Sequence, residues 1–252
     1  MPALIAFPAG LLVGSFVTVI AHRIPRGEGF VAGRSHCPSC GAQIAAHDNV
    51  PVLSWLMLRG RCRSCGEHIS ARYPLAELAV AVLYAATVLN LGTGDAAALA
   101  SGIVLCTVLV AVSLTDLERR VIPNKIVAAG AIAALAIAAL GDPSELPERL
   151  AAGAIAGGVL FVIALAYPRG MGMGDVKLVA MLGLFLGSAV APAVLIGFAV
   201  GAAVGLVMIA MHGSAARKQA IPFGPFLALG GIVGLWWGPE MVDWYVNRFF
   251  GG

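Results

Sequence analysis

The sequence predicts an all-α, polytopic membrane protein, and three observations support this fold class. Of its 252 residues, 60% are hydrophobic and only 12% are charged, whereas soluble domains carry about 25% charged residues. The apolar residues gather in eight long runs, and the basic residues gather between alternate runs. We therefore expect about eight transmembrane helices and one cytoplasmic loop large enough to form a zinc-binding subdomain.

The eight apolar runs give the expected order of the helices. A helix needs ~20 mainly apolar residues to cross a hydrocarbon core of ~30 Å. The runs cover residues 2–21, 74–91, 96–115, 126–140, 150–167, 176–187, 190–211 and 223–237. The fourth and the sixth are short for a span. The 32 glycines of the chain would allow the helices to pack closely in lipid.

The basic residues predict the orientation of the chain. Fourteen of the 16 Lys and Arg lie in segments 22–74, 116–125, 168–177 and 212–221, and only Arg149 and Arg248 fall on the other side of an eight-span arrangement. The positive-inside rule places those four segments in the cytoplasm and both termini in the periplasm. The net charge of +3 reflects this asymmetry and does not indicate nucleic-acid binding. No basic residue precedes the first run, which favours an uncleaved first helix over a signal peptide.

Segment 22–74 contains four cysteines with the spacing of a metal site. Cys37-x2-Cys40 and Cys62-x2-Cys65 are separated by 21 residues, and a glycine follows each pair. Two such turns can surround one tetrahedral ion with four thiolates, so the pattern predicts a structural zinc site without an open coordination position. The alternatives are two disulfides or redox cysteines, which a reducing cytoplasm disfavours, and free thiols.

Two aspartates lie at the edges of apolar runs. Asp116 closes the third run, and Asp175 precedes the sixth. An ionisable group at the edge of the hydrocarbon is costly and by default indicates a functional site. The alternative is that each marks a helix end, with Asp175 capping its helix and Asp116 paired with Arg119 or Lys177. Both aspartates are predicted on the cytoplasmic side, which favours a joint function, although they are 59 residues apart.

Two neighbouring carboxyl groups have a defined chemistry. Like charges do not both ionise at low cost, so the pair would share one proton. The ionised group would take a proton from water, and the neutral group would protonate the peptide carbonyl that the water attacks. Gly172 and Gly174 would leave space for a substrate backbone beside Asp175. The sequence contains no GxSxG elbow and no Walker loop that would indicate another reaction.

Two other functional classes are compatible with these residues. A transporter would use the aspartates to carry a proton or a sodium ion, but such sites usually lie near the membrane midplane. A non-catalytic assembly factor would use the tetracysteine loop to bind a cytoplasmic partner. In that case variants of the aspartates would behave as the parent does.

Six motifs follow one another along the chain: GSFVTVIAHRIP, CPSCGAQIAAHDNVPVLSWLMLRGRCRSC, ISARYPLAELA, TDLERRVIPN, GMGMGDVKLVAMLG and IPFGPFLALGG. In this order they resemble the motifs of the type IV prepilin peptidases, which are bifunctional leader peptidases and N-methyltransferases. The GxGD motif at residues 172–175 is also shared with other intramembrane aspartyl proteases. The resemblance implies that Asp116 and Asp175 are catalytic and that Gly172, Gly174 and Lys177 border the substrate.

The resemblance also implies three parts, cofactors and partners. Residues 1–21 would form the first transmembrane helix, 22–74 the cytoplasmic tetracysteine loop associated with methyl transfer, and 75–252 the membrane protease domain. The implied cofactors are zinc and S-adenosyl-L-methionine. Glu77 is a candidate residue of the methyltransferase half, and the alternative is a carboxylate at the membrane edge that pairs with Arg72. The implied substrates are type IV prepilins or type II secretion pseudopilins in the inner membrane, in contact with lipid and without nucleic acid. A leader peptidase without methyltransferase activity is the alternative.

Overall fold

The computed structural model describes residues 1–29, 35–168, 170–213 and 221–250. Within these residues the regular elements are helices, and extended backbone pairs only in two isolated bridges, His36 with Gln43 and Arg61 with His68. The all-α fold class is confirmed. Four basic residues used to predict the orientation lie outside the described residues: Arg34, Arg169, Arg217 and Lys218.

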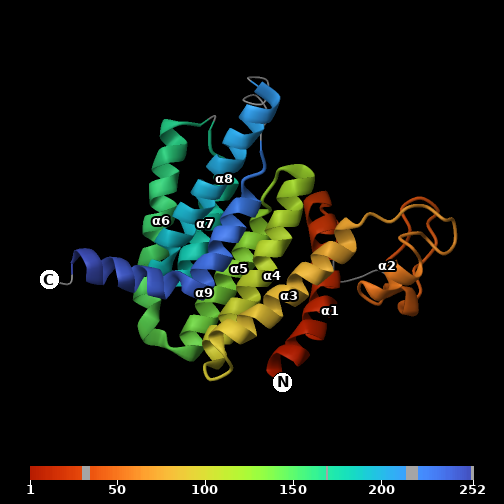
Figure 1. The fold of residues 1–252 in the computed structure, drawn as a ribbon, viewed down its shortest axis with the longest axis horizontal. Helices are drawn as coiled ribbons and strands as arrows, with labels where there is room; N and C mark the ends of the chain where they lie inside the picture. Colours follow the sequence, from red (N-terminus) through yellow and green to blue (C-terminus); the bar gives the residue numbers. More distant parts are fainter. Residues whose placement is uncertain (30–34, 169, 214–220, 251–252) are drawn as a thin grey trace. The chain divides into compact units, whose positions relative to one another are not determined.

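Each of the eight apolar runs falls within a single helix, apart from at most one residue at one end (Figure 1). Several helices extend beyond their runs, and the extension of α9 is the longest. The helices are α1 (Pro2–Arg23), α2 (Leu53–Met57), α3 (Arg72–Leu91), α4 (Ala96–Arg119), α5 (Asn124–Gly141), α6 (Leu146–Ala166), α7 (Met173–Leu186), α8 (Val190–His212) and α9 (Gly224–Phe249). Short 3-10 turns are η1 (Ile24–Arg26), η2 (Ala46–Asn49), η3 (Pro143–Glu145) and η4 (Gly187–Ala189). Only α2 lies outside the predicted runs, within the tetracysteine loop.

Six helical stretches of the described chain are long and apolar enough to cross a membrane. One of them, Met173–His212, contains both α7 and α8, while α9 is not among the six. α7 has 14 residues, which corresponds to about 21 Å at 1.5 Å per residue and is shorter than the hydrocarbon core. The chain therefore has the helices of a multi-pass membrane protein, and the number of eight spans remains a prediction.

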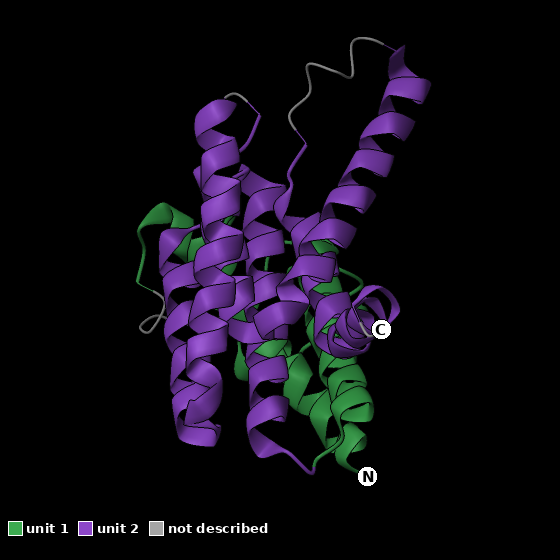
Figure 2. Cartoon of the chain, turned by 90° about the vertical axis from the view of Figure 1, so that its left-hand side faces the viewer, with its two compact units in different colours: residues 1–93 green, residues 94–252 purple. Residues whose placement is uncertain are grey.

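The chain divides into two compact units, residues 1–93 and 94–252 (Figure 2). Unit 1 contains α1, the tetracysteine loop and α3, so the second apolar helix belongs with the first helix and the loop. α1 and α3 pack closely along a glycine face of α1. A Cβ on Gly10 would lie 2.5 Å from the Cα of Ala81, and one on Gly14 would lie 2.6 Å from the Cα of Glu77. Only glycine permits so close an approach of two backbones.

Unit 2 consists of α4 to α9, and its core lies where α4, α7 and α9 pack against one another. The large side chains that are fully buried in it include Leu105 and Leu109 of α4, Leu178 and Leu182 of α7, and Leu227 of α9. α4 ends where α7 and α9 begin, so polar residues at these three helix ends are brought together. This common end is called the aspartate end below.

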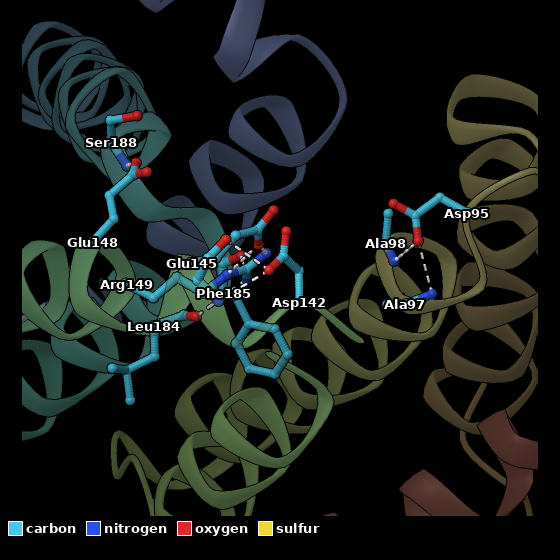
Figure 3. A network of polar contacts seen from close by, with 11 residues as sticks. Asp95, Ala97, Ala98, Asp142, Glu145, Glu148, Arg149, Leu184, Phe185 and Ser188 are labelled. Carbon is cyan, nitrogen blue, oxygen red and sulfur yellow. Dashed lines mark hydrogen bonds and ion pairs between the residues drawn. The ribbon is translucent and has the colours of Figure 1, made fainter. Parts of the chain in front are cut away.

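A polar network holds the opposite end of unit 2 (Figure 3). Arg149 of α6 donates hydrogen bonds to the carbonyl oxygens of Phe185, at 2.6 Å, and Leu184, at 3.4 Å, which end α7. Glu148 accepts a hydrogen bond from the N–H of Ser188 at 3.1 Å. Arg149 thus satisfies carbonyl groups at the end of α7, and Glu148 satisfies a backbone N–H group of the turn that follows. They fix the short α7 at the end away from Asp175.

Candidate active site and metal centre

Asp116 lies in the last turn of α4 and is only 6% exposed. Its Oδ2 atom accepts a hydrogen bond of 2.7 Å from the backbone N–H of Gly224, the first residue of α9. The first N–H groups of a helix have no partner within it, and they carry a partial positive charge. The beginning of α9 therefore provides a favourable site for the carboxylate of Asp116.

Gly224 leaves no room for a side chain at this contact. A Cβ there would lie 2.9 Å from Oδ2 and 3.2 Å from Cβ of Asp116. The sequence analysis did not identify Gly224 as a site residue. The available signal was local: Phe-Gly-Pro opens the last apolar run, and proline is favoured in the first turn of a helix. The pattern predicts where the helix begins, but it does not identify the carboxylate that the helix meets.

Asp175 lies in the first turn of α7, for which Gly172 is the N-cap residue. The N–H of Asp175 donates to the carbonyl oxygen of Gly172 at 3.1 Å. A Cβ on Gly172 would lie 3.1 Å from Oδ2 of Asp175, so this glycine keeps the space beside the carboxylate free. A Cβ on Gly174 would lie 2.9 Å from the Cβ of Ile122. Gly174 therefore allows α7 to begin against the segment that follows α4.

The two aspartates lie at the same end of unit 2. α4 contacts α7, and the charge of Asp116 acts electrostatically on Asp175. Within the described residues, Asp116 forms no ion pair with Arg119 or Lys177. The ammonium group of Lys177 instead donates to Oδ1 of Asn124 at 2.9 Å and connects α7 with the start of α5. The arrangement favours a joint role of the carboxylates over two separate helix-end roles.

The four cysteines of unit 1 lie in two turns with the same backbone pattern. The N–H of Gly41 donates to the carbonyl of Cys37, and the N–H of Gly66 donates to that of Cys62, each at 2.9 Å. Both glycines have a positive φ, 71° and 73°, which a residue without Cβ adopts at little cost. Each CxxC pair thus forms a tight knuckle that points its thiols to one side.

The geometry of the four thiols fits a tetrahedral ion. The Sγ atoms of Cys37, Cys40, Cys62 and Cys65 all lie within 4.8 Å of one another. The Cys37 and Cys65 sulfurs are 3.8 Å apart. A zinc ion with Zn–S bonds of about 2.3 Å places its sulfurs about 3.8 Å apart, whereas a disulfide requires about 2.05 Å. The cluster can hold a metal ion, and its cysteines are not joined as disulfides.

The electrostatics of this cluster favour a bound cation. Hydrogen bonds from the backbone of Cys40 and Ser39 lower the pKa of Cys37 to about 6. At Cys65, a backbone hydrogen bond from Glu67 lowers the pKa, but the neighbouring thiols outweigh it and raise the pKa to about 12. One thiolate therefore suppresses the ionisation of another when no cation compensates the charge. A metal ion would remove this conflict by binding all four as thiolates.

Glu77 connects the loop to the membrane helices of unit 1. Its side chain is buried in α3, and its Oε2 accepts a hydrogen bond of 2.7 Å from the N–H of Val52. It also forms a hydrogen bond with the side chain of Ser15 in α1. In the part of the chain that the structure describes, Glu77 has no ion pair with Arg72. These contacts are those of a residue that positions the loop.

Comparison with known proteins identifies related sequences over most of the chain. Residues 9–91 match the bacterial peptidase A24 N-terminal domain, and residues 103–209 match the type IV leader peptidase family. A prepilin leader peptidase/N-methyltransferase of Aeromonas hydrophila is 37% identical, with 97% of this chain and 94% of the relative aligned. The protein of that name from Bacillus subtilis (strain 168) is 35% identical, over 98% and 99%. A third, from Burkholderia pseudomallei (strain K96243), is 38% identical, over 92% and 84%.

No solved structure matches this chain. The sequence relationship is nevertheless strong, because identities of 35–38% extend through both units. The chain belongs to the type IV leader peptidase family, whose curated relatives are prepilin leader peptidases and N-methyltransferases.

Proposed function

We propose that this protein is an aspartic endopeptidase of the bacterial inner membrane. It removes the basic leader of type IV prepilins or pseudopilins and then methylates the new N-terminal amine. The observation that carries this proposal is the aspartate end of unit 2, where Asp116 and Asp175 lie together in a chain of the type IV leader peptidase family.

In the proposed cleavage, the two carboxyl groups share one proton and act as one unit. The ionised carboxylate takes a proton from a water molecule, whose oxygen attacks the carbonyl carbon of the scissile peptide bond. The neutral carboxyl group gives its proton to the carbonyl oxygen. The carboxyl group that took the proton from water then gives it to the leaving nitrogen, and the C–N bond breaks. The intermediate returns one hydroxyl proton to the other carboxylate, which restores the pair with its one shared proton. The N–H of Gly224 holds Asp116 in place throughout, and Gly172 keeps the space beside Asp175 open for the substrate backbone.

The charge distribution supports placing this chemistry on the cytoplasmic side. The basic residues lie in the segments that flank the aspartates, and the positive-inside rule assigns such segments to the cytoplasm. A prepilin leader is itself basic and precedes an apolar helix, so the same rule keeps it on that side. The bond between leader and helix would lie at the inner interface. Both termini of this protein would then be periplasmic, and Lys177 would stand exposed beside the substrate path.

We assign zinc to the cluster of Cys37, Cys40, Cys62 and Cys65. Four thiolates close its coordination sphere, so the ion would stabilise the loop and would not activate water. When bound, S-adenosyl-L-methionine would supply an electrophilic methyl group for the new amine. Glu77 would act as a positioning residue of this half, because it fixes Val52 and therefore the loop to α3.

One experiment reads both reactions. The purified protein in liposomes is incubated with a synthetic prepilin and S-adenosyl-L-methionine. The mass of the N-terminal peptide of the product is then measured by mass spectrometry. The proposal predicts a shortened product carrying one added methyl group. A shortened product without the methyl group would remove the methyltransferase activity alone. Uncleaved prepilin would refute the peptidase activity. Proton or sodium flux without cleavage would support a transporter instead.

A further inference from the structure

The tetracysteine loop contains an apolar surface that the proposed function does not use. Three apolar residues of α2 are largely exposed: the exposed fraction is 58% for Leu53, 57% for Leu56 and 82% for Met57. These three side chains, called the α2 platform below, lie in the most polar segment of the chain (orange in Figure 1). Large apolar side chains grouped on one short element usually mark an interaction site.

The α2 platform is held in a defined orientation. The hydroxyl group of Ser54 donates to the carbonyl of His47 at 2.9 Å and accepts from the N–H of Val50 at 3.1 Å. The indole N–H of Trp55 donates to the carbonyl of Ile69 at 2.9 Å. Ser54 and Trp55 thus fix the inward side of α2 to the loop. Because the opposite side of α2 is held by these hydrogen bonds, the platform residues point away from the loop in a well-defined helix.

The position of α2 relative to α3 indicates what covers the platform. The N–H of Val52, directly before α2, donates to Glu77. Glu77 is five residues beyond Arg72, where the membrane-span candidate α3 begins, which corresponds to about 7.5 Å along the helix axis. The polar headgroup region on each side of a bilayer is roughly this deep. The start of α2 is therefore held beside the second turn of α3, within about one headgroup depth of the end of this membrane-span candidate.

The residues that follow α2 fit the same surroundings. Arg59 and Arg61 are exposed and come directly after the apolar segment. Arginines beside an apolar surface at a membrane interface attract the phosphates of acidic lipids. Val52 has a φ of 60°, which is unusual for a β-branched residue. The N–H of Val52 donates to Glu77 in this conformation, which ties the residue before α2 to α3.

We infer that the α2 platform inserts into the inner leaflet of the membrane, with Arg59 and Arg61 at the phosphates of acidic phospholipids. The choice of leaflet rests on the proposed cytoplasmic orientation of the loop. Insertion would hold the metal centre at the bilayer surface beside α1 and α3. The proposed N-terminal amine of a cleaved substrate would emerge at that same surface.

Site-specific photo-cross-linking tests this inference. Met57 is replaced by p-benzoylphenylalanine in the full-length protein, which is placed in phosphatidylethanolamine–phosphatidylglycerol liposomes with prepilin and irradiated. Intact mass analysis is expected to show a phospholipid adduct. The same substitution at the exposed Glu67, in the second knuckle and outside the α2 platform, serves as the control and should give a much weaker lipid adduct. A prepilin adduct, a dimer or no adduct at position 57 would overturn the inference, and so would equal lipid labelling at position 67.

A second measurement separates this inference from the proposed function. A phosphatidylglycerol with a diazirine in its acyl chain labels the parent and the double variant L56D/M57D, and peptide 50–59 is quantified. Labelling should fall about tenfold in the variant because charged side chains do not enter the interface. Prepilin cleavage, which depends on unit 2, should persist. Unchanged labelling would overturn the insertion of α2, whereas absent cleavage with normal labelling of the parent would refute only the peptidase proposal.

The role of the arginines is tested by changing the lipid. Labelling of the parent should fall when phosphatidylcholine replaces the unlabelled phosphatidylglycerol, and an unchanged value would refute the role of the arginines.

Discussion

The two polar sites of this protein are built in opposite ways. The tetracysteine cluster of unit 1 comes from two short turns, and each turn is closed by hydrogen bonds between residues a few positions apart. The aspartate end of unit 2 comes from three helices, and its hydrogen bond between Asp116 and Gly224 joins residues 108 positions apart. The first site therefore depends on local backbone geometry, and the second depends on how α4, α7 and α9 pack.

This difference predicts different sensitivities. A change in helix packing should damage the aspartate end and leave the metal cluster intact. A change in the cysteines should release the metal and leave the aspartates in place. The variants below test this separation, from the largest expected effect to the smallest.

Replacement of either aspartate should have the largest effect. Asp116→Asn or Asp175→Asn removes a group that transfers a proton, and such groups typically contribute 10²–10⁴-fold, so we expect cleavage to fall by about 10³-fold or more. Metal content should equal that of the parent. The matched control is Asp243→Asn, which changes an exposed aspartate of α9. Leader-cleavage rates and metal analysis on the same preparations check this, and cleavage at the parental rate by either variant would exclude the mechanism.

Gly224→Ala should reduce cleavage without removing a catalytic group. The added Cβ would lie 2.9 Å from Oδ2 of Asp116, so the carboxylate must move, and a small misplacement at a reacting group can cost about 10²-fold. We expect kcat to fall more than KM rises. Gly205→Ala in α8 is the control, since a Cβ there meets nothing within 4 Å. Equal kinetics for the two alanine variants would show that the contact has no role in catalysis.

Loss of one thiol should separate the two reactions. Cys65→Ser should lower the metal content from about one ion per chain to near zero, because a structural zinc site needs all four ligands. Methylation should then be lost while much of the cleavage remains. Ser64→Ala, at the exposed neighbouring position, should keep the metal. Loss of cleavage equal to the loss of methylation in Cys65→Ser would contradict the independence of the two sites.

The metal site should also release its ion in acid. Backbone hydrogen bonds lower the pKa of Cys37 to about 6, so its thiolate persists above that pH and is protonated as the pH falls through it. Protons compete with a metal for thiolates, and a bound cation favours the thiolate, so we expect metal retention to decrease only at a pH below this metal-free value. Metal analysis after dialysis over a pH series measures this. Retention that is constant from pH 7 to pH 4 would be inconsistent with a thiolate site.

The smallest effect is expected for an exposed ion pair within the loop. Arg63 donates two hydrogen bonds to Asp48, at 2.6 and 2.7 Å. These bonds are the main reason why the pKa of Asp48 is lowered. The contribution of this pair is present above the ordinary pKa of Asp and is lost as the pH falls through the lowered value. Asp48→Asn should lower Tm slightly near pH 7, and the difference should narrow in acid. A difference that widens in acid would contradict this sign.

The comparison also explains what could be predicted from the sequence. The apolar runs define the helices because a membrane helix must satisfy its own backbone and hide its polar groups. The Cys37–Cys40 and Cys62–Cys65 turns were predictable because a CxxC-Gly turn fixes its own geometry. In both cases the determining contacts lie within a few residues of one another.

The remaining features depend on contacts between distant segments. The hydrogen bond between Asp116 and Gly224 requires α9 to begin beside the end of α4, and periodicity does not specify that neighbour. The contact of Glu77 with Val52 likewise requires the loop to fold back onto α3. The sequence identified Glu77 and Asp116 as unusual charges, but their partners are backbone N–H groups, and these have no signature in a sequence.

The central claim is that Asp116 and Asp175 form one site, and short-range cross-linking tests it without relying on activity. The double variant D116C/D175C in liposomes is treated with a short bifunctional maleimide, and peptides are mapped by mass spectrometry. The account predicts a link within one chain between positions 116 and 175. The control D95C/D175C places its cysteines at opposite ends of unit 2 and should give no link. Absence of the 116–175 link, or equal linking in the control, would contradict the account.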